Sequence, residues 1–217
     1  MSRLLSANYA RLKRDKVVWL LVLFMFTFGV LRTGVALINF KYYNEILSFD
    51  SLFFNYTVMS GFLTAAFGSL FIGTEYSDGG IRNKLIVGHR RSNLYGAYLI
   101  TVISVSILLC LAYIVPVSVM GIPVLGFFRI DVLTLVIYLL GSLFMVVAFS
   151  SIVTLICMLN TNKALAAVIS ILSILLLLVL SAYISERLSA PEFYDGIANG
   201  GTFSIFSGYI NFRRYFL

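Results

Sequence analysis

The chain has 217 residues, of which 60% are hydrophobic and only 12% are charged, and its mean hydropathy is +0.99. A soluble domain carries about 25% charged residues, so this composition excludes a soluble globular protein and indicates an integral membrane protein. In a soluble chain the net charge of +7 would suggest nucleic-acid binding. Here the positions of the charges indicate membrane orientation instead, and we expect no nucleic-acid partner.

The chain begins with a basic segment, residues 1–16, which holds five cations and one acid. Four of its apolar and aromatic residues can share one face of a helix: Leu4, Leu5, Tyr9 and Leu12. This pattern predicts an interfacial helix on the inner leaflet of the membrane. A basic tail that only sets the orientation of the protein fits the same composition.

The first apolar run covers residues 17–39. At 1.5 Å per residue it extends about 34 Å, which is enough to cross the hydrocarbon layer with some tilt. It contains Arg32 in its outer part. That cation is either functional within the membrane or reaches the outer interface through its long aliphatic stem.

Four further apolar runs predict four more spans, at residues 51–73, 95–119, 132–158 and 164–184. The run 51–73 carries small residues at spacings that suit close helix packing: Gly61, Ala65, Gly68 and Ser69. The run 95–119 has Pro116 near its end, and a short loop over 121–131 contains Pro123. Residues 185–217 are mixed in character and predict an extracellular or re-entrant segment. We therefore expect an all-α, five-span bundle that forms a single transmembrane domain over residues 1–217.

Charge counting gives the orientation of these spans. If the N-terminus, the segment 74–94 and the turn 159–163 lie inside, the inner side holds ten cations and three acids. The opposite side then holds six of each. Because cytoplasmic loops carry an excess of Lys and Arg, this predicts that the N-terminus is cytoplasmic.

The polar segment 74–94 is the part of the chain most suited to a contact with a partner. The pair Gly79-Gly80 predicts a turn. A short amphipathic helix would follow, with Ile81 and Leu85 on its apolar side and Arg82, Asn83 and Lys84 on the others, and Ile86 is a further candidate for the apolar side. Gly88 suits the residue that ends this helix and Ser92 suits the N-cap of the next. A plain cytoplasmic loop that only fixes orientation explains the same residues.

Several chemistries have no signature in this sequence. It contains neither a phosphate-binding loop G-x-x-x-x-G-K-[ST] nor an H-E-x-x-H metal motif, and its single histidine is His89. The predicted spans contain no Asp or Glu, whereas ion-coupled carriers normally need intramembrane acids. We therefore expect no catalytic residues, no metal and no cofactor in this chain, and a transporter of this kind would take its energy from another protein.

The central segment carries an acid, Glu75, and then three short blocks that lead into the third span: Gly79-Gly80-Ile81-Arg82, Asn83-Lys84-Leu85 and Gly88-His89-Arg90-Arg91. In this order and position the blocks resemble the membrane subunits of type-two ABC exporters, bacterial permeases that pair with a separate ATPase chain. The resemblance extends by layout over nearly the whole chain. Gly80 departs from the Thr or Ser that is usual in the family, which removes a capping hydroxyl but not the turn.

The resemblance implies a mechanism and partners. Two permease chains, expected as a homodimer among membrane lipids of the bacterial cytoplasmic membrane, would form the pathway, and two ATPase subunits holding ATP and Mg²⁺ would dock below. The helix at about 81–87 would be the coupling helix, with Glu75 and Arg82 able to pair beside it. The other contact residues would be Gly79, Gly80, Ile81, Asn83, Lys84, Leu85, His89, Arg90 and Arg91.

The family usually has six spans, so either this sequence is shortened or residues 202–217 replace the sixth; we favour the first. An aromatic-lined interface between the first, second and fifth spans resembles permeases that export amphipathic or antimicrobial peptides or confer immunity to them. Drug or lipid export stays open. The alternative from a different class is a membrane immunity or assembly protein that acts alone, without transport.

Overall fold

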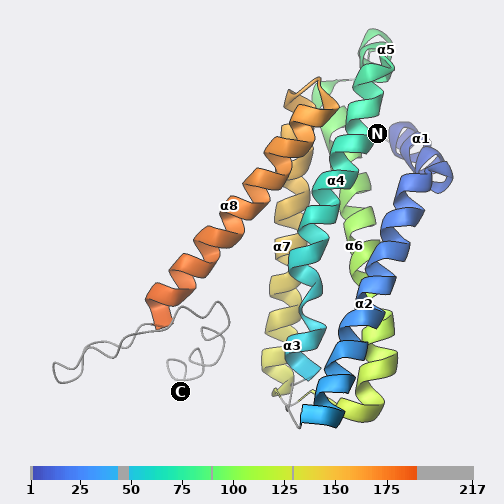
Figure 1. Ribbon diagram of the computed structural model, residues 1–217. Helices are drawn as coiled ribbons and strands as arrows, with labels where there is room; N and C mark the ends of the chain where they lie inside the picture. Colours follow the sequence, from blue (N-terminus) through green and yellow to red (C-terminus); the bar gives the residue numbers. More distant parts are fainter. Residues whose placement is uncertain (1, 44–48, 89, 129, 190–217) are drawn as a thin grey trace. The chain divides into compact units, whose positions relative to one another are not determined.

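The computed structural model describes residues 2–43, 49–88, 90–128 and 130–189, and these form helices only (Figure 1). The N-terminal half contains α1 (Ser2–Arg14), α2 (Lys16–Tyr43), α3 (Phe49–Phe53), α4 (Tyr56–Ser77) and α5 (Gly80–Ile86). The rest contains α6 (Arg91–Leu125), α7 (Val132–Leu159) and α8 (Lys163–Ser189). Five stretches are long and apolar enough to span a membrane: α2, α3 with α4, α6, α7 and α8. The predicted all-α bundle with five spans is confirmed.

Contacts divide the chain into two units, with the boundary between Ile171 and Leu172. In the first unit α6 is the central helix, since it packs against α1, α2, α3, α4 and α7. Helix α4 packs against α7 as well as α6, and α1 and α5 lie at the same end of this unit (Figure 1). In the described part of the second unit, which is the C-terminal part of α8, Arg187 Nε donates to the Tyr183 hydroxyl at 3.2 Å.

Small residues allow α4 to approach its neighbours closely. Gly61, Ala65, Gly68 and Ser69 are all buried, as their spacing predicts. A Cβ atom added at Gly68 would lie 2.6 Å from Val153 Cγ1 on α7. The helix–helix contact here therefore depends on the missing side chain.

The predicted second span is present, but its helix is interrupted near its N-terminal end. Phe54 and Asn55 separate α3 from α4, and Asn55 N–H bonds to Leu52 O, three positions back, at 3.4 Å. At this break the rings of Phe53 and Tyr56 meet edge to face, with centroids 6.2 Å apart. A cluster of bulky rings packed in different directions accounts for the interruption of the helix.

The third span also differs from its prediction, which ended at about residue 119 and placed 121–131 in a loop. Helix α6 continues to Leu125 and contains both Pro116 and Pro123. Proline removes one backbone bond, but packed neighbours in an apolar medium keep such a helix intact. The helix ends where Gly126 takes a positive φ of 82°. It also starts at Arg91, with Arg90 at the N-cap position, so the expected N-cap at Ser92 is wrong.

Candidate functional site

A polar cluster centred on Glu75 lies where α1, α4, α5 and α6 come together. Glu75 stands in the last turn of α4, and its side chain is only 12% exposed. Its Oε1 accepts from Arg11 Nη1 at 2.7 Å. Its Oε2 accepts from Lys84 Nζ and from the Tyr98 hydroxyl, each at 2.7 Å. One carboxylate therefore joins α4 to three other helices.

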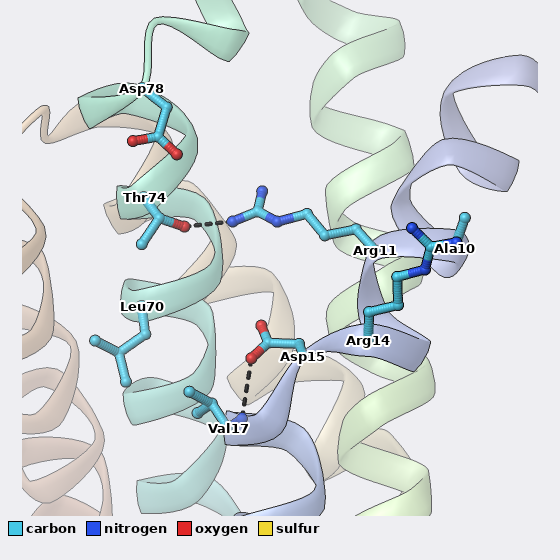
Figure 2. A pocket seen from close by; sticks show the side chains of 8 residues that line it. All are labelled: Ala10, Arg11, Arg14, Asp15, Val17, Leu70, Thr74 and Asp78. Atoms are coloured by element: carbon cyan, nitrogen blue, oxygen red, sulfur yellow. Dashed lines mark hydrogen bonds between the residues drawn. The ribbon is translucent and has the colours of Figure 1, made fainter.

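The two cations of this cluster are held by further contacts. Figure 2 shows Arg11 reaching from α1 across to α4, where it also donates to Thr74 Oγ1. The Arg11 guanidinium lies 4.6 Å from the centre of the Phe71 ring. Lys84 Nζ donates to the Tyr98 hydroxyl at 3.0 Å. Because each cation is partly withdrawn from water and paired, removing the carboxylate would leave both charges poorly compensated.

Glycines set the position of α5 beside this cluster. Gly79 is the N-cap of α5 with φ +72°, and Gly88 follows its end with φ +94°, both in the left-handed region. These are the turn and the helix end that the sequence predicts. A Cβ atom at Gly80 would lie 2.9 Å from Glu75 Oε2. The space that a Ser or Thr would use is thus occupied by the carboxylate, which explains why glycine suits this position.

The structure divides the predicted contact residues of α5 into an inner and an outer set. Ile81 is buried at 4% exposure, and Lys84 and Leu85 are half-buried. Arg82 and Asn83 are exposed. Ile86, the further candidate for the apolar side, is 76% exposed because it lies one helical step beyond Leu85 and points away from the bundle.

The expected pairing of Glu75 with Arg82 is also wrong. Lys84 and Arg11 occupy the carboxylate, while Arg82 stands on the exposed side of α5 and forms no ion pair with any residue that the structure describes. Arg90 and Arg91 are exposed at the start of α6, and His89 lies outside the described residues.

Sequence reasoning missed three members of the cluster: Arg11, Thr74 and Tyr98. Arg11 was counted only as one cation of a basic segment, and Tyr98 only as part of an apolar span. The signal available in the sequence was the apolar face predicted for α1, which needs a surface to pack against. Leu4 and Asn8 are buried, and Asn8 Nδ2 donates to Thr101 Oγ1 on α6 at 3.4 Å. Helix α1 is therefore packed on the bundle and is not a free basic tail.

Hydroxyl groups continue the connection between helices within the bundle. Thr64 Oγ1 on α4 lies 2.8 Å from Ser106 Oγ on α6, which lies 3.1 Å from Ser150 Oγ on α7. The Tyr56 hydroxyl is bonded to Ser142 Oγ at 2.7 Å, again joining α4 to α7. Helices α4, α6 and α7 are thus bonded to one another along their length, and the cluster around Glu75 adds α1 and α5 at one end.

The residues that the structure describes form five helical stretches long and apolar enough to span a membrane, and Lys84 holds the short helix α5 beside them through its ion pair with Glu75. Residues 4–181 match the family model described as ABC-2 family transporter protein. The chain belongs to this family, as the sequence resemblance implied, and is a multi-pass permease subunit of an ABC transporter. Comparisons with curated proteins and with solved structures gave no match.

Proposed function

We propose that this permease subunit belongs to an exporter and that α5 is the helix on which the separate ATPase docks. The observation that carries this proposal is the division of α5 into two faces. Lys84 and Ile81 fix one face to the bundle, whereas Arg82, Ile86 and Val87 are exposed on the other. A cation beside two exposed apolar side chains suits a groove with an apolar floor and an acidic rim.

The mechanism follows from how α5 is held. A helix of seven residues is not stable by itself in water, so its position depends on its contacts. Movement of a docked ATPase would pass through Lys84 to Glu75 and α4, and from the same carboxylate to Arg11 on α1. Rigid-body movement of packed helices is the expected form of such coupling. ATP and Mg²⁺ would be bound by the partner, and this chain would contribute no catalytic residue.

For the cargo we propose an amphipathic or hydrophobic molecule of the peptide class, moved across a bacterial cytoplasmic membrane by a homodimer with cytoplasmic N-termini. Two observations support this cargo class. The sequence resembles peptide-exporting permeases, and the five apolar runs predicted as spans contain no Asp or Glu. The charge distribution supports the orientation.

Charge reversal on the outer face of α5 tests the docking proposal. Arg82→Glu should abolish co-purification of the partner ATPase, while the permease stays folded, because Arg82 forms no ion pair with a residue that the structure describes. Lys41→Glu reverses an exposed cation in the last turn of α2, and it should leave association with the ATPase unchanged. If Arg82→Glu retains normal association and normal stimulation of ATP hydrolysis, the docking face is wrong. Function of the chain in cells that lack the ATPase would favour a protein that acts alone.

A further inference from the structure

A pocket of about 700 Å³ lies beside the Glu75 cluster, and two members of that cluster, Arg11 and Thr74, form part of its wall. It is bounded by α1, by the start of α2 and by the last turns of α4 (Figure 2). Because its walls come from the first unit alone, its shape is set by helices that pack directly on one another.

The α4 wall of this pocket changes from apolar to acidic along one line. Leu70, Thr74 and Asp78 are spaced four residues apart, so they lie above one another on the same helix face, as Figure 2 shows. They cover about 12 Å of helix. Leu70 is 42% exposed. The gradient is the one that a phospholipid presents, from acyl chain through the glycerol region to the charged headgroup.

The charges around the pocket are of both signs. Arg11 is paired with Glu75, a carboxylate that it shares with Lys84, and Asp15 Oδ1 accepts from Val17 N–H at 2.9 Å at the start of α2. The side chains of Arg14 and Asp78 are exposed, and neither forms a hydrogen bond or ion pair with a residue that the structure describes. The pocket thus offers one unpaired cation and one unpaired acid, which suits a ligand with one charge of each sign better than a purely anionic one.

The neighbouring residues place the pocket at the membrane surface. Trp19 is 59% exposed, and its indole Nε1 donates to Lys13 O at 3.3 Å. Tryptophan with an apolar body and a bonded N–H is typical of the membrane–water interface. Leu20 and Leu23, one turn further along α2, are 64% and 65% exposed, as expected of side chains that face lipid.

We propose that this pocket binds the headgroup of a zwitterionic phospholipid with a primary ammonium, phosphatidylethanolamine. The phosphate lies at Arg14, the ammonium at Asp78, and the first part of an acyl chain on Leu70. The proposal is independent of the ATPase-docking proposal, since it requires neither the partner nor movement of α5.

Native mass spectrometry of the full chain tests this site. Detergent-purified protein would be mixed with equal amounts of phosphatidylethanolamine, phosphatidylglycerol and phosphatidylcholine, and the lipid retained would be counted. Wild type should retain one phosphatidylethanolamine with about tenfold preference over each of the other two lipids. This is the factor that corresponds to one ion pair worth about 1.4 kcal/mol. Asp78→Asn should remove that preference over phosphatidylcholine, and Leu70→Trp, which fills the pocket, should remove the bound lipid.

Lys13→Gln is the matched control, because it removes an exposed cation of α1 that does not line the pocket. It should leave retention unchanged, whereas Arg14→Gln should reduce it about tenfold. Circular dichroism and size-exclusion chromatography would show that Leu70→Trp is folded; if it is not, Asp78→Asn and Arg14→Gln decide the question. The proposal is overturned if wild type retains phosphatidylglycerol as well as or better than phosphatidylethanolamine. It is also overturned if Asp78→Asn and Arg14→Gln retain as much phosphatidylethanolamine as wild type.

Discussion

Arg11 Nη1 and Glu75 Oε1 are 2.7 Å apart although 64 residues separate them in the chain. This contact fixes the basic N-terminal helix to the end of α4, and Lys84 fixes α5 to the same carboxylate. The N-terminal helix and the proposed docking helix are therefore joined through a single side chain. Any change at Glu75 alters both connections at once.

Replacing Glu75 with Gln should destabilise the protein. The amide keeps the shape of the side chain but leaves Arg11 and Lys84 without their counter-ion. Breaking a buried pair costs about 3–5 kcal/mol, and because these cations are partly exposed we expect about 1–3 kcal/mol. Denaturant unfolding in detergent measures this loss. Asp131→Asn, at an exposed acid with no side-chain cap bond, is the control and should change stability by less than about 0.5 kcal/mol.

Gly80→Ala should act through Glu75, whereas Gly79→Ala should act through the backbone. The new Cβ at residue 80 would displace the carboxylate, so Gly80→Ala and Glu75→Gln should be strongly non-additive in a double-mutant cycle. At Gly79 nothing lies within 4 Å of the added atom, and the positive φ should cost about 1–2 kcal/mol independently of residue 75. If the effects of Gly80→Ala and Glu75→Gln are additive, the carboxylate does not fill the space beside Gly80.

Gly68→Ala should weaken the contact between α4 and α7, because its Cβ would collide with Val153. Overpacking of this kind costs about 1–3 kcal/mol. Gly141→Ala on α7 is the matched control, since nothing lies within 4 Å of the added atom, and it should be neutral or stabilising by about 0.5–1 kcal/mol. Thermal unfolding of both variants in the same detergent measures the difference, and equal melting temperatures would contradict the close approach at Gly68.

Ser106→Ala should remove the hydroxyl that joins α4 to α7 through α6. Hydrogen bonds between membrane helices contribute about 0.6 kcal/mol on average and up to about 1.7 kcal/mol, so the loss of two should cost about 1–2 kcal/mol. Among the described residues, the Ser151 hydroxyl, which Ser151→Ala removes, bonds to Val147 O of its own helix and to no other helix. Unfolding measurements should show a smaller effect for that control; the reverse order would mean that the hydroxyl chain does not hold the helices together.

Apolar length and charge distribution were enough to predict the five spans, because the membrane requires long apolar helices with satisfied backbone groups. The ends of these helices were harder to place. Pro116 and Pro123 indicated the end of a span by rules that hold in water, yet α6 includes both. The break at Phe54 depends on aromatic packing between several helices, which the local sequence does not contain.

At the candidate site, the sequence was enough to predict the features that depend on local backbone conformation, namely the turn before α5 and the end of α5. Gly79 and Gly88 bound a short helix as expected, because positive φ at glycine is a local property. The partners of Glu75 depend on tertiary packing. Arg82 and Lys84 are both close to Glu75 along the chain, but only the rotation of α5 about its axis decides which of them points inward, and Arg11 is brought near by the packing of α1 on α6.

Cargo-stimulated ATP hydrolysis by the complex of Glu75→Gln with its ATPase tests most directly whether this carboxylate transmits movement. The variant leaves Arg82, Ile86 and Val87 unchanged, so the ATPase should still co-purify at the wild-type ratio, while stimulation by cargo should fall at least tenfold. Wild-type stimulation in a folded Glu75→Gln complex would contradict the account.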